Sequence, residues 1–77
     1  MKVPFEQLST QCQRILLYLA VYAAIDPIRA MTELGIMRLA ARISDLEKAG
    51  YPFEHEMVDS VNRFGEKVRY MEYRMVA

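Results

Sequence analysis

The chain has 77 residues, with ten basic and ten acidic side chains, a formal net charge of zero and 53% hydrophobic residues. This length allows one domain, and a domain of this size buries about 60–65% of the surface of its unfolded chain. Cys12 is the only cysteine, which excludes an intrachain disulfide and argues against a cysteine-based zinc site. The longest apolar run, residues 15–25, is shorter than the ~20 residues that span a bilayer, so no membrane partner is expected.

Charged side chains are unevenly distributed along the chain. Three acidic residues, Glu54, Glu56 and Asp59, fall within residues 51–59, whereas basic residues are in excess in residues 36–50 and 60–77. Domains that bind DNA through charge alone are usually more basic than this chain. Any contact with a polyanion therefore has to depend on these local basic segments and not on the total charge.

The first helix is predicted at residues 10–24. Thr10 and Gln13 match a T-x-x-Q capping box, in which two side chains satisfy backbone amides at the start of a helix. One side of this helix collects apolar residues at helical spacing and is expected to face the core. These residues are Cys12, Ile15, Leu19, Tyr22 and Ala23. Residues 1–8 are predicted to form a loose N-terminal arm.

The other side of this helix is also apolar after its first turn. The strip consists of Leu17, Tyr18, Val21 and Ala24. Two further helices and a small hairpin are not expected to cover all of it, and exposed apolar surface of this kind marks interaction sites. We therefore predict a homodimer interface on this strip. The alternative is that the N-terminal arm, residues 3–5, folds back over it.

Two shorter helices are predicted at residues 27–34 and 37–49. Asp26 is a good N-cap, Pro27 suits the first helical position, and Gly35 and Gly50 suit helix ends. The buried edge of the first of these helices is expected to contain Ile28, Met31 and Leu34. In the second helix, the residues expected in the core are Leu39, Ile43 and Leu46. The opposite face is expected to expose Arg38, Ala41, Arg42 and Asp45.

An antiparallel hairpin is predicted from residues 53–61 and 67–75. The three-residue loop 63–65 places Gly65 at a left-handed position and pairs Asn62 with Glu66, which is a common hairpin type. This register puts opposite charges such as Asp59 and Arg69 across from one another and gives the hairpin an apolar face. Ile25 is expected to add a short third strand.

The order of three helices followed by a hairpin predicts an α+β winged helix-turn-helix fold in one domain, residues 1–77. The stretches LGIMRLAARISDLEKAGYP (34–52) and NRFGEKVRYMEYRM (62–75) resemble a family of small winged helix-turn-helix domains common in phage and prophage genomes. The similarity covers residues 13–75, and its most specific pieces are GI-x-RL-x-ARI-x-DL, GYP and NR-x-GEK. The resemblance implies a DNA-binding fold, usually without enzymatic activity.

In a helix-turn-helix, the helix predicted here at residues 37–49 enters the major groove. Arg38 and Arg42 lie one turn apart on its exposed face beside Ala41, and arginine is well suited to bidentate contacts with guanine. We therefore predict that these three residues bind DNA. The alternative is an ordinary solvated face on which the arginines pair with Asp45 or Glu47.

The hairpin supplies a second set of predicted DNA contacts. Arg63, Lys67 and Arg69 are expected to hold phosphates or to enter the minor groove, contacts that fix position more than sequence. The alternative is that these charges only keep an exposed strand edge soluble. Phe64 at the loop tip is expected to contact a partner, since an exposed aromatic there has little structural use.

The sequence offers little catalytic chemistry. His55, the only histidine, is expected to face Tyr73 as a half-buried structural residue. Glycine-rich phosphate loops, paired catalytic carboxylates and metal-ligand spacings are not recognisable in the sequence. We therefore expect a non-enzymatic protein with no catalytic residue, no metal and no cofactor.

The predicted function is binding of double-stranded DNA by a homodimer in the cytoplasm, or in the host cytoplasm if the protein is phage-encoded. The role is expected to be transcriptional regulation or an architectural task. The alternative is a protein-interaction module whose hairpin or first helix binds a protein partner, such as a polymerase or a host factor.

Overall fold

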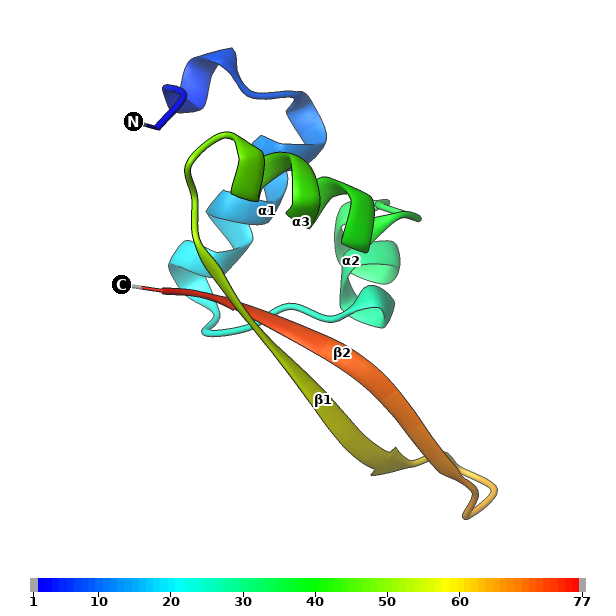
Figure 1. The fold of residues 1–77 in the computed structure, drawn as a ribbon. Helices are drawn as coiled ribbons and strands as arrows, with labels where there is room; N and C mark the ends of the chain where they lie inside the picture. Colours follow the sequence, from blue (N-terminus) through cyan, green and yellow to red (C-terminus); the bar gives the residue numbers. More distant parts are fainter. Residues whose placement is uncertain (1, 77) are drawn as a thin grey trace.

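The structure is a computed structural model that describes residues 2–76, so both end residues of the predicted domain lie outside the described part. A 3-10 turn, Phe5–Gln7, precedes the helices α1 (Thr10–Val21), α2 (Pro27–Leu34) and α3 (Leu39–Lys48). The strands β1 (Phe53–Val61) and β2 (Lys67–Met75) follow. Figure 1 shows the three helices packed together and the two strands projecting from them as a hairpin. The predicted α+β order is confirmed.

The ends of α1 differ from the predicted ones. Ser9 is the N-cap, because its hydroxyl oxygen accepts a hydrogen bond from the amide of Cys12 at 3.3 Å. Thr10 is therefore the first helical residue and not the cap. The helix ends at Val21, since Tyr22 already has an extended backbone with φ −113° and ψ 145°.

The core-facing side of α1 is also corrected. Cys12 and Ile15 are buried as predicted, but Tyr22 and Ala23 are exposed because they lie beyond the end of the helix. Tyr18, predicted to belong to the outward strip, is only 6% exposed and contributes to the core.

The ends of α2 follow the sequence signals. The amide of Arg29 donates to the Asp26 carboxylate at 2.9 Å, and Pro27 occupies the first turn. Gly35 closes the helix in the left-handed conformation with φ 70°, where a residue with a Cβ would be strained. The predicted bounds of this helix are confirmed.

The predicted buried edge of α2 is mostly wrong. Ile28 and Met31 are 60% and 46% exposed, Leu34 is half-buried, and the buried residue is Ala30. A two-turn helix that packs on both α1 and α3 approaches them closely where its side chain is small. The larger side chains of α2 are consequently turned toward solvent.

Helix α3 begins two residues later than predicted, with Arg38 as its N-cap and no side-chain hydrogen bond at the cap. The predicted inward positions are confirmed, since Leu39, Ile43 and Leu46 are each at most 2% exposed.

The hairpin has the predicted register, from Phe53 opposite Met75 to Val61 opposite Lys67. In the loop, the side-chain oxygen of Asn62 accepts from the amides of Phe64 and Glu66, at 2.9 and 3.1 Å. These two bonds fix the backbone of the three-residue loop.

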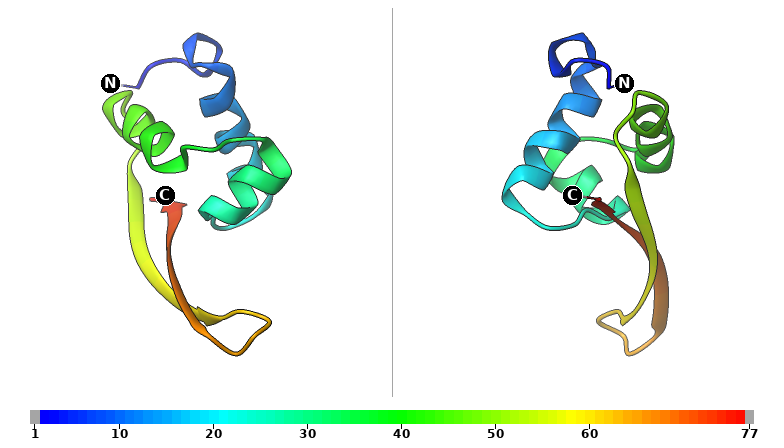
Figure 2. Two further views of the ribbon diagram at one scale, coloured as in Figure 1. Left: turned by 90° about the vertical axis from the view of Figure 1, so that its right-hand side faces the viewer. Right: turned by 60° about the vertical axis from the view of Figure 1, so that its left-hand side comes forward.

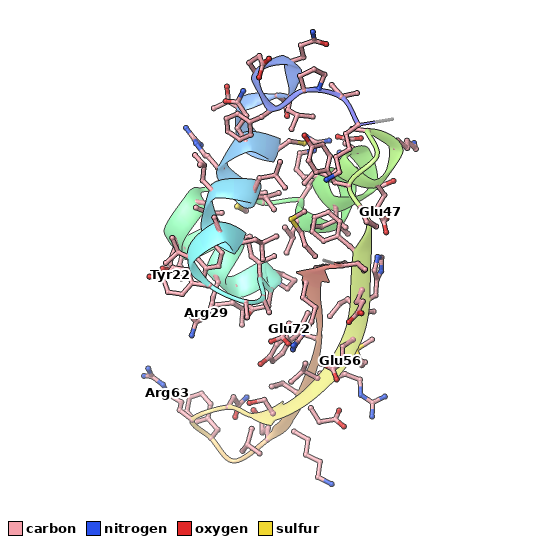
Figure 3. All side chains as sticks on the ribbon, turned by 90° about the vertical axis from the view of Figure 1, so that its left-hand side faces the viewer. Tyr22, Arg29, Glu47, Glu56, Arg63 and Glu72 are labelled. Atoms are coloured by element: carbon pink, nitrogen blue, oxygen red, sulfur yellow. The ribbon has the colours of Figure 1, made fainter. Side chains whose placement is uncertain are left out.

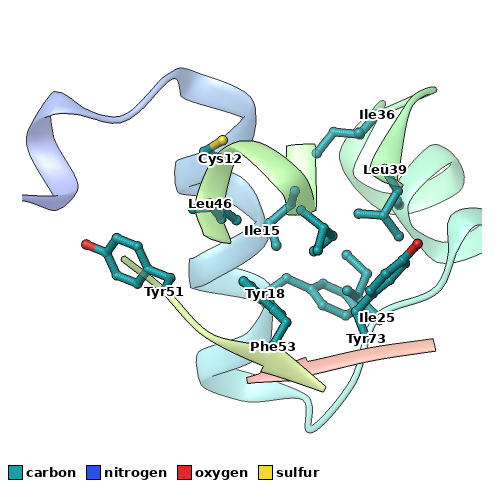
Figure 4. Close-up of a cluster of buried hydrophobic side chains, with 12 residues drawn as sticks. Cys12, Ile15, Tyr18, Ile25, Ile36, Leu39, Leu46, Tyr51, Phe53 and Tyr73 are labelled. Carbon is teal, nitrogen blue, oxygen red and sulfur yellow. The ribbon is translucent and has the colours of Figure 1, made fainter. Parts of the chain in front are cut away.

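The core lies between the three helices and the base of the hairpin. Its most completely buried side chains are Ile15, Ile25, Ile36, Ile43 and Leu46. Figure 4 shows Tyr18, Phe53 and Tyr73 closing this cluster on the side of the hairpin. Among residues 2–76, the structure contains no helix long and apolar enough to cross a membrane.

The N-terminal segment is not a loose arm. The Val3 amide donates to the Ala49 carbonyl at 2.8 Å, and the Tyr51 hydroxyl donates to the Val3 carbonyl at 2.7 Å. The Gln13 side chain also donates to the Phe5 carbonyl at 2.9 Å. These bonds attach the segment to the start of α1 and to the end of α3.

Candidate nucleic-acid interface

Helix α2, the start of α3 and the tip of the hairpin lie on one side of the molecule. Figures 1 and 2 show the strands curving so that loop 62–66 ends on the side of α2. In Figure 3, Arg63 at the tip lies on the same side as Arg29 of α2 and on the opposite side from Glu47. Residues 35–38 join α2 directly to α3, which brings the N-terminal end of α3 to this side as well.

The outward surface of α3 carries small side chains, the half-buried Arg42 and the exposed acids Asp45 and Glu47, with a cation at each end. Arg38 precedes the helix, Lys48 ends it, and both are exposed; Ala40 is exposed, while Ala41 and Ser44 are half-buried. The predicted contacts Arg38 and Ala41 therefore reach the surface. Ala40, Ser44 and Lys48 were not predicted as contacts, although the periodicity of the buried positions already places them outside the core.

Arg42 is not the freely exposed side chain that was predicted. Its side chain is 31% exposed, and its Nε is buried 3.0 Å from Oδ2 of Asp45, an ion pair without hydrogen-bond alignment. Its carbonyl oxygen also accepts from the Cys12 thiol at 3.8 Å. Arg42 lies on the flank of α3 beside α1, which explains its partial burial.

The basic side chains of the hairpin divide into two kinds. Arg69 forms an ion pair with Asp59 across the strands, with Nε 2.7 Å from Oδ1. Arg63 and Lys67 are exposed, and within residues 2–76 neither forms an ion pair; the same holds for Arg38. Lys67 and the Asp59–Arg69 pair line one open hollow of the hairpin. Of the five predicted cations, Arg38, Arg63 and Lys67 can therefore bind an anion without the loss of an internal ion pair.

Phe64 stands at the tip of the hairpin and is 81% exposed. Its backbone is fixed by the bond to Asn62, while its ring has no place in the core. The predicted exposure at the tip is confirmed.

The family model described as "Winged helix-turn-helix domain" matches residues 10–77. The chain belongs to this family. Comparisons with curated proteins and with solved structures gave no match. Winged helix-turn-helix domains are typically non-enzymatic and generally bind DNA, so the resemblance drawn from the sequence is confirmed at the level of the fold family.

This winged helix-turn-helix domain exposes part of the predicted strip on α1. Leu17 and Val21 are 61% and 74% exposed, and Ala24 is half-buried. The N-terminal segment does not cover Leu17 and Val21, so the alternative that residues 3–5 fold back over this strip is wrong.

Tyr18, in contrast, has internal polar partners. The Tyr18 hydroxyl donates to Oε2 of Glu33 at 3.2 Å and accepts from Arg29 at 3.4 Å. The bond to Tyr18 is the main cause that raises the pKa of Arg29, with Glu33 and Asp26 adding to it. Tyr18 therefore links α1 to α2 within the domain.

Two acidic residues of the wing, Glu56 and Glu72, have an internal partner. Arg74 lies 2.7 Å from Glu72 and 3.5 Å from Glu56, and the bond to Glu72 is the main cause that raises the pKa of Arg74. These carboxylates are thereby partly neutralised within the hairpin.

His55 links the wing to α3. His55 Nε2 lies 3.0 Å from Oε2 of Glu47, and its ring packs edge-on against Tyr73 at 5.0 Å. Burial, followed by the charge of Glu47, raises the pKa of Tyr73. The predicted contact between His55 and Tyr73 is confirmed, but His55 is exposed and not half-buried.

Proposed function

We propose that this winged helix-turn-helix domain binds double-stranded DNA with α3 in the major groove and the wing on the adjacent backbone. Arg38 is proposed to reach a base edge and Ala41 to contact the groove floor, while Arg63, Lys67 and Arg69 contact phosphates or the minor groove. Phe64 at the tip lies against the sugar–phosphate backbone in this arrangement. Arg42 contacts DNA in this arrangement only when a phosphate displaces its internal partner, Asp45.

One observation carries this proposal. The unpaired cations Arg38, Arg63 and Lys67 lie at the N-cap of α3 and on the wing, and in helix-turn-helix docking a helix placed like α3 enters the major groove. Binding depends on the local charge that faces the duplex and not on the total charge, so a neutral chain is compatible with it. Glu56 and Glu72 repel DNA only weakly, because both carboxylates pair with Arg74.

The biological role proposed here is that of a phage- or prophage-type regulator of transcription or architectural factor, acting in the cytoplasm. Small side chains on α3 suit close approach to the groove, and wing cations suit positioning on the backbone. Both roles require only binding, for which the domain needs no cofactor.

A homodimer is part of the proposal. Leu17 and Val21 are adjacent on one face of α1, and burying two such side chains stabilises an interface by about 1.5–3 kcal/mol each. A second copy would double the number of cations presented to one duplex. Two-fold symmetric dimers are by far the commonest homo-oligomers.

The test compares the wild-type protein with the variant Arg38→Ala/Arg63→Ala/Lys67→Ala, using fluorescence anisotropy with a labelled mixed-sequence duplex at low salt. We expect the wild type to bind and the triple variant to lose most of this binding. Equal binding by the two proteins would contradict the proposed interface. No binding by either protein would contradict the proposed function itself.

A second candidate function is docking to a protein partner. It is favoured by the exposed Phe64 at the wing tip and by the exposed apolar side chains Ile28, Met31 and Met37 of the α2–α3 unit. The two candidates differ in one measurable respect. Failure to bind any duplex at low salt, with the protein folded, would favour the protein partner.

A further inference from the structure

Two cations of the proposed interface already have a carboxylate partner on their own structural element. On α3, Arg42 Nε lies 3.0 Å from Asp45 one turn away. On the wing, Arg69 Nε lies 2.7 Å from Asp59 on the facing strand, with hydrogen-bond geometry. Both aspartates are exposed, so a phosphate that reaches either arginine also meets the aspartate.

In each of these two pairs, the negative charge of the aspartate cancels the positive charge of the arginine before DNA binds. A phosphate oxygen that binds Arg42 or Arg69 has to displace the carboxylate or share the guanidinium with it. The contact then releases fewer counterions from DNA than a contact with a free cation does, and counterion release supplies most of the sequence-independent affinity. In the described part of the chain, no carboxylate competes in this way for the three unpaired cations Arg38, Arg63 and Lys67.

Building on the proposed function, we propose that Asp45 and Asp59 are affinity-determining residues that compete with DNA phosphate for Arg42 and Arg69. Their effect is to lower binding to duplexes of every sequence. Contacts that depend on sequence then account for a larger share of the affinity on a preferred site. The neutral charge of the chain is, in this view, a means of limiting non-specific binding.

Other acidic residues of the domain provide matched controls. Glu6 belongs to the 3-10 turn Phe5–Gln7 and is exposed. This turn lies at the opposite end of the molecule from the wing tip (Figure 1). The change Glu6→Gln alters the net charge by the same amount as Asp45→Asn or Asp59→Asn. It leaves both arginine pairs intact, so it separates a local effect from that of total charge.

The experiment measures fluorescence anisotropy of a labelled mixed-sequence duplex with wild type, Asp45→Asn, Asp59→Asn and Glu6→Gln at several salt concentrations. We expect each aspartate variant to bind about two- to five-fold more tightly at low salt, the range that an exposed ion pair supports. The plot of log K against log salt should become steeper by about 0.9 per freed cation. Glu6→Gln should change both quantities much less. Thermal melting by circular dichroism checks that all four proteins are folded.

A double-variant comparison distinguishes competition from simple repulsion. If Asp59 acts by occupying Arg69, the gain from Asp59→Asn should largely disappear in an Arg69→Gln background. An undiminished gain in that background would overturn the competition mechanism, and aspartate variants that behave like Glu6→Gln would overturn the inference while the proposed function stands. Absence of duplex binding by wild type and all variants would instead reject the proposed function and this inference together.

Discussion

Ile25 and Tyr73 exchange two backbone hydrogen bonds, with the Ile25 amide 2.9 Å from the Tyr73 carbonyl and the Tyr73 amide 2.8 Å from the Ile25 carbonyl. This single bridge joins the segment between α1 and α2 to β2. Both side chains are also buried in the core. The base of the wing is therefore fixed to the helix-turn-helix, whereas the distal part of the hairpin has only its own two strands.

The burial of the Tyr73 ring beside this bridge predicts unequal effects of two tyrosine substitutions on β2. Tyr73→Ala removes a buried ring and should lower the free energy of unfolding by about 3–5 kcal/mol. Tyr70→Ala, on the same strand but half-buried in the projecting hairpin, should cost much less. Urea denaturation followed by circular dichroism measures both values. Equal losses would contradict the assigned role of the buried Tyr73 ring in stabilising the base of the wing.

The fold was largely predictable because its turns carry strong local signals. Asp26-Pro27 and Gly35 fixed the bounds of α2, and Gly65 after Asn62 fixed the hairpin register. These signals act through the backbone of a few neighbouring residues, so the sequence alone contains them.

Side-chain burial was less predictable where helices are short. In α2, close packing selected Ala30 as the buried residue in place of the larger Ile28 and Met31, and α1 ended before Tyr22. The pairing of Arg42 with Asp45 was the alternative offered by the sequence, but the partial burial of Arg42 could not be read from periodicity, because it depends on the packing of α3 against α1. Such features arise from tertiary packing, which a one-dimensional pattern does not specify.

Arg38 and Arg42 are expected to contribute differently to sequence preference. If Arg38 reads a base, Arg38→Ala should cost about 1–3 kcal/mol on a preferred duplex and much less on mixed sequence. Arg42→Ala should cost less, because Arg42 starts from a pair with Asp45. Selection from a duplex library followed by anisotropy titrations measures these differences. A larger loss for Arg42 would reverse the assigned roles.

Lys67 is expected to contact phosphate and not a base. Lys67→Ala should weaken binding to all duplexes alike and make the salt dependence shallower by about one unit. Lys2→Ala removes the same charge beside Tyr51, away from the wing, and serves as the control. A sequence-dependent loss for Lys67→Ala would argue that Lys67 touches base edges.

The α1 strip is expected to join two copies of the domain. Leu17→Glu/Val21→Glu should give a folded monomer, since both side chains are already exposed within one copy and their replacement leaves the core intact. Ile28→Glu/Met31→Glu changes two exposed apolar residues of α2 and should leave the dimer intact. Sedimentation velocity over a range of concentrations measures the outcome. A wild-type protein that stays monomeric at high concentration would reject the interface.

The salt dependence of duplex binding by the wild-type domain tests the central claim most directly. If each of the three unpaired cations of the proposed interface, Arg38, Arg63 and Lys67, neutralises one phosphate of a mixed-sequence duplex, the slope of log K against log salt is about −2.7 per domain, with binding strongest at low salt. Anisotropy titrations of a labelled duplex across a salt series give this slope. A folded domain that binds no duplex at low salt, or binds with no salt dependence, would contradict the account.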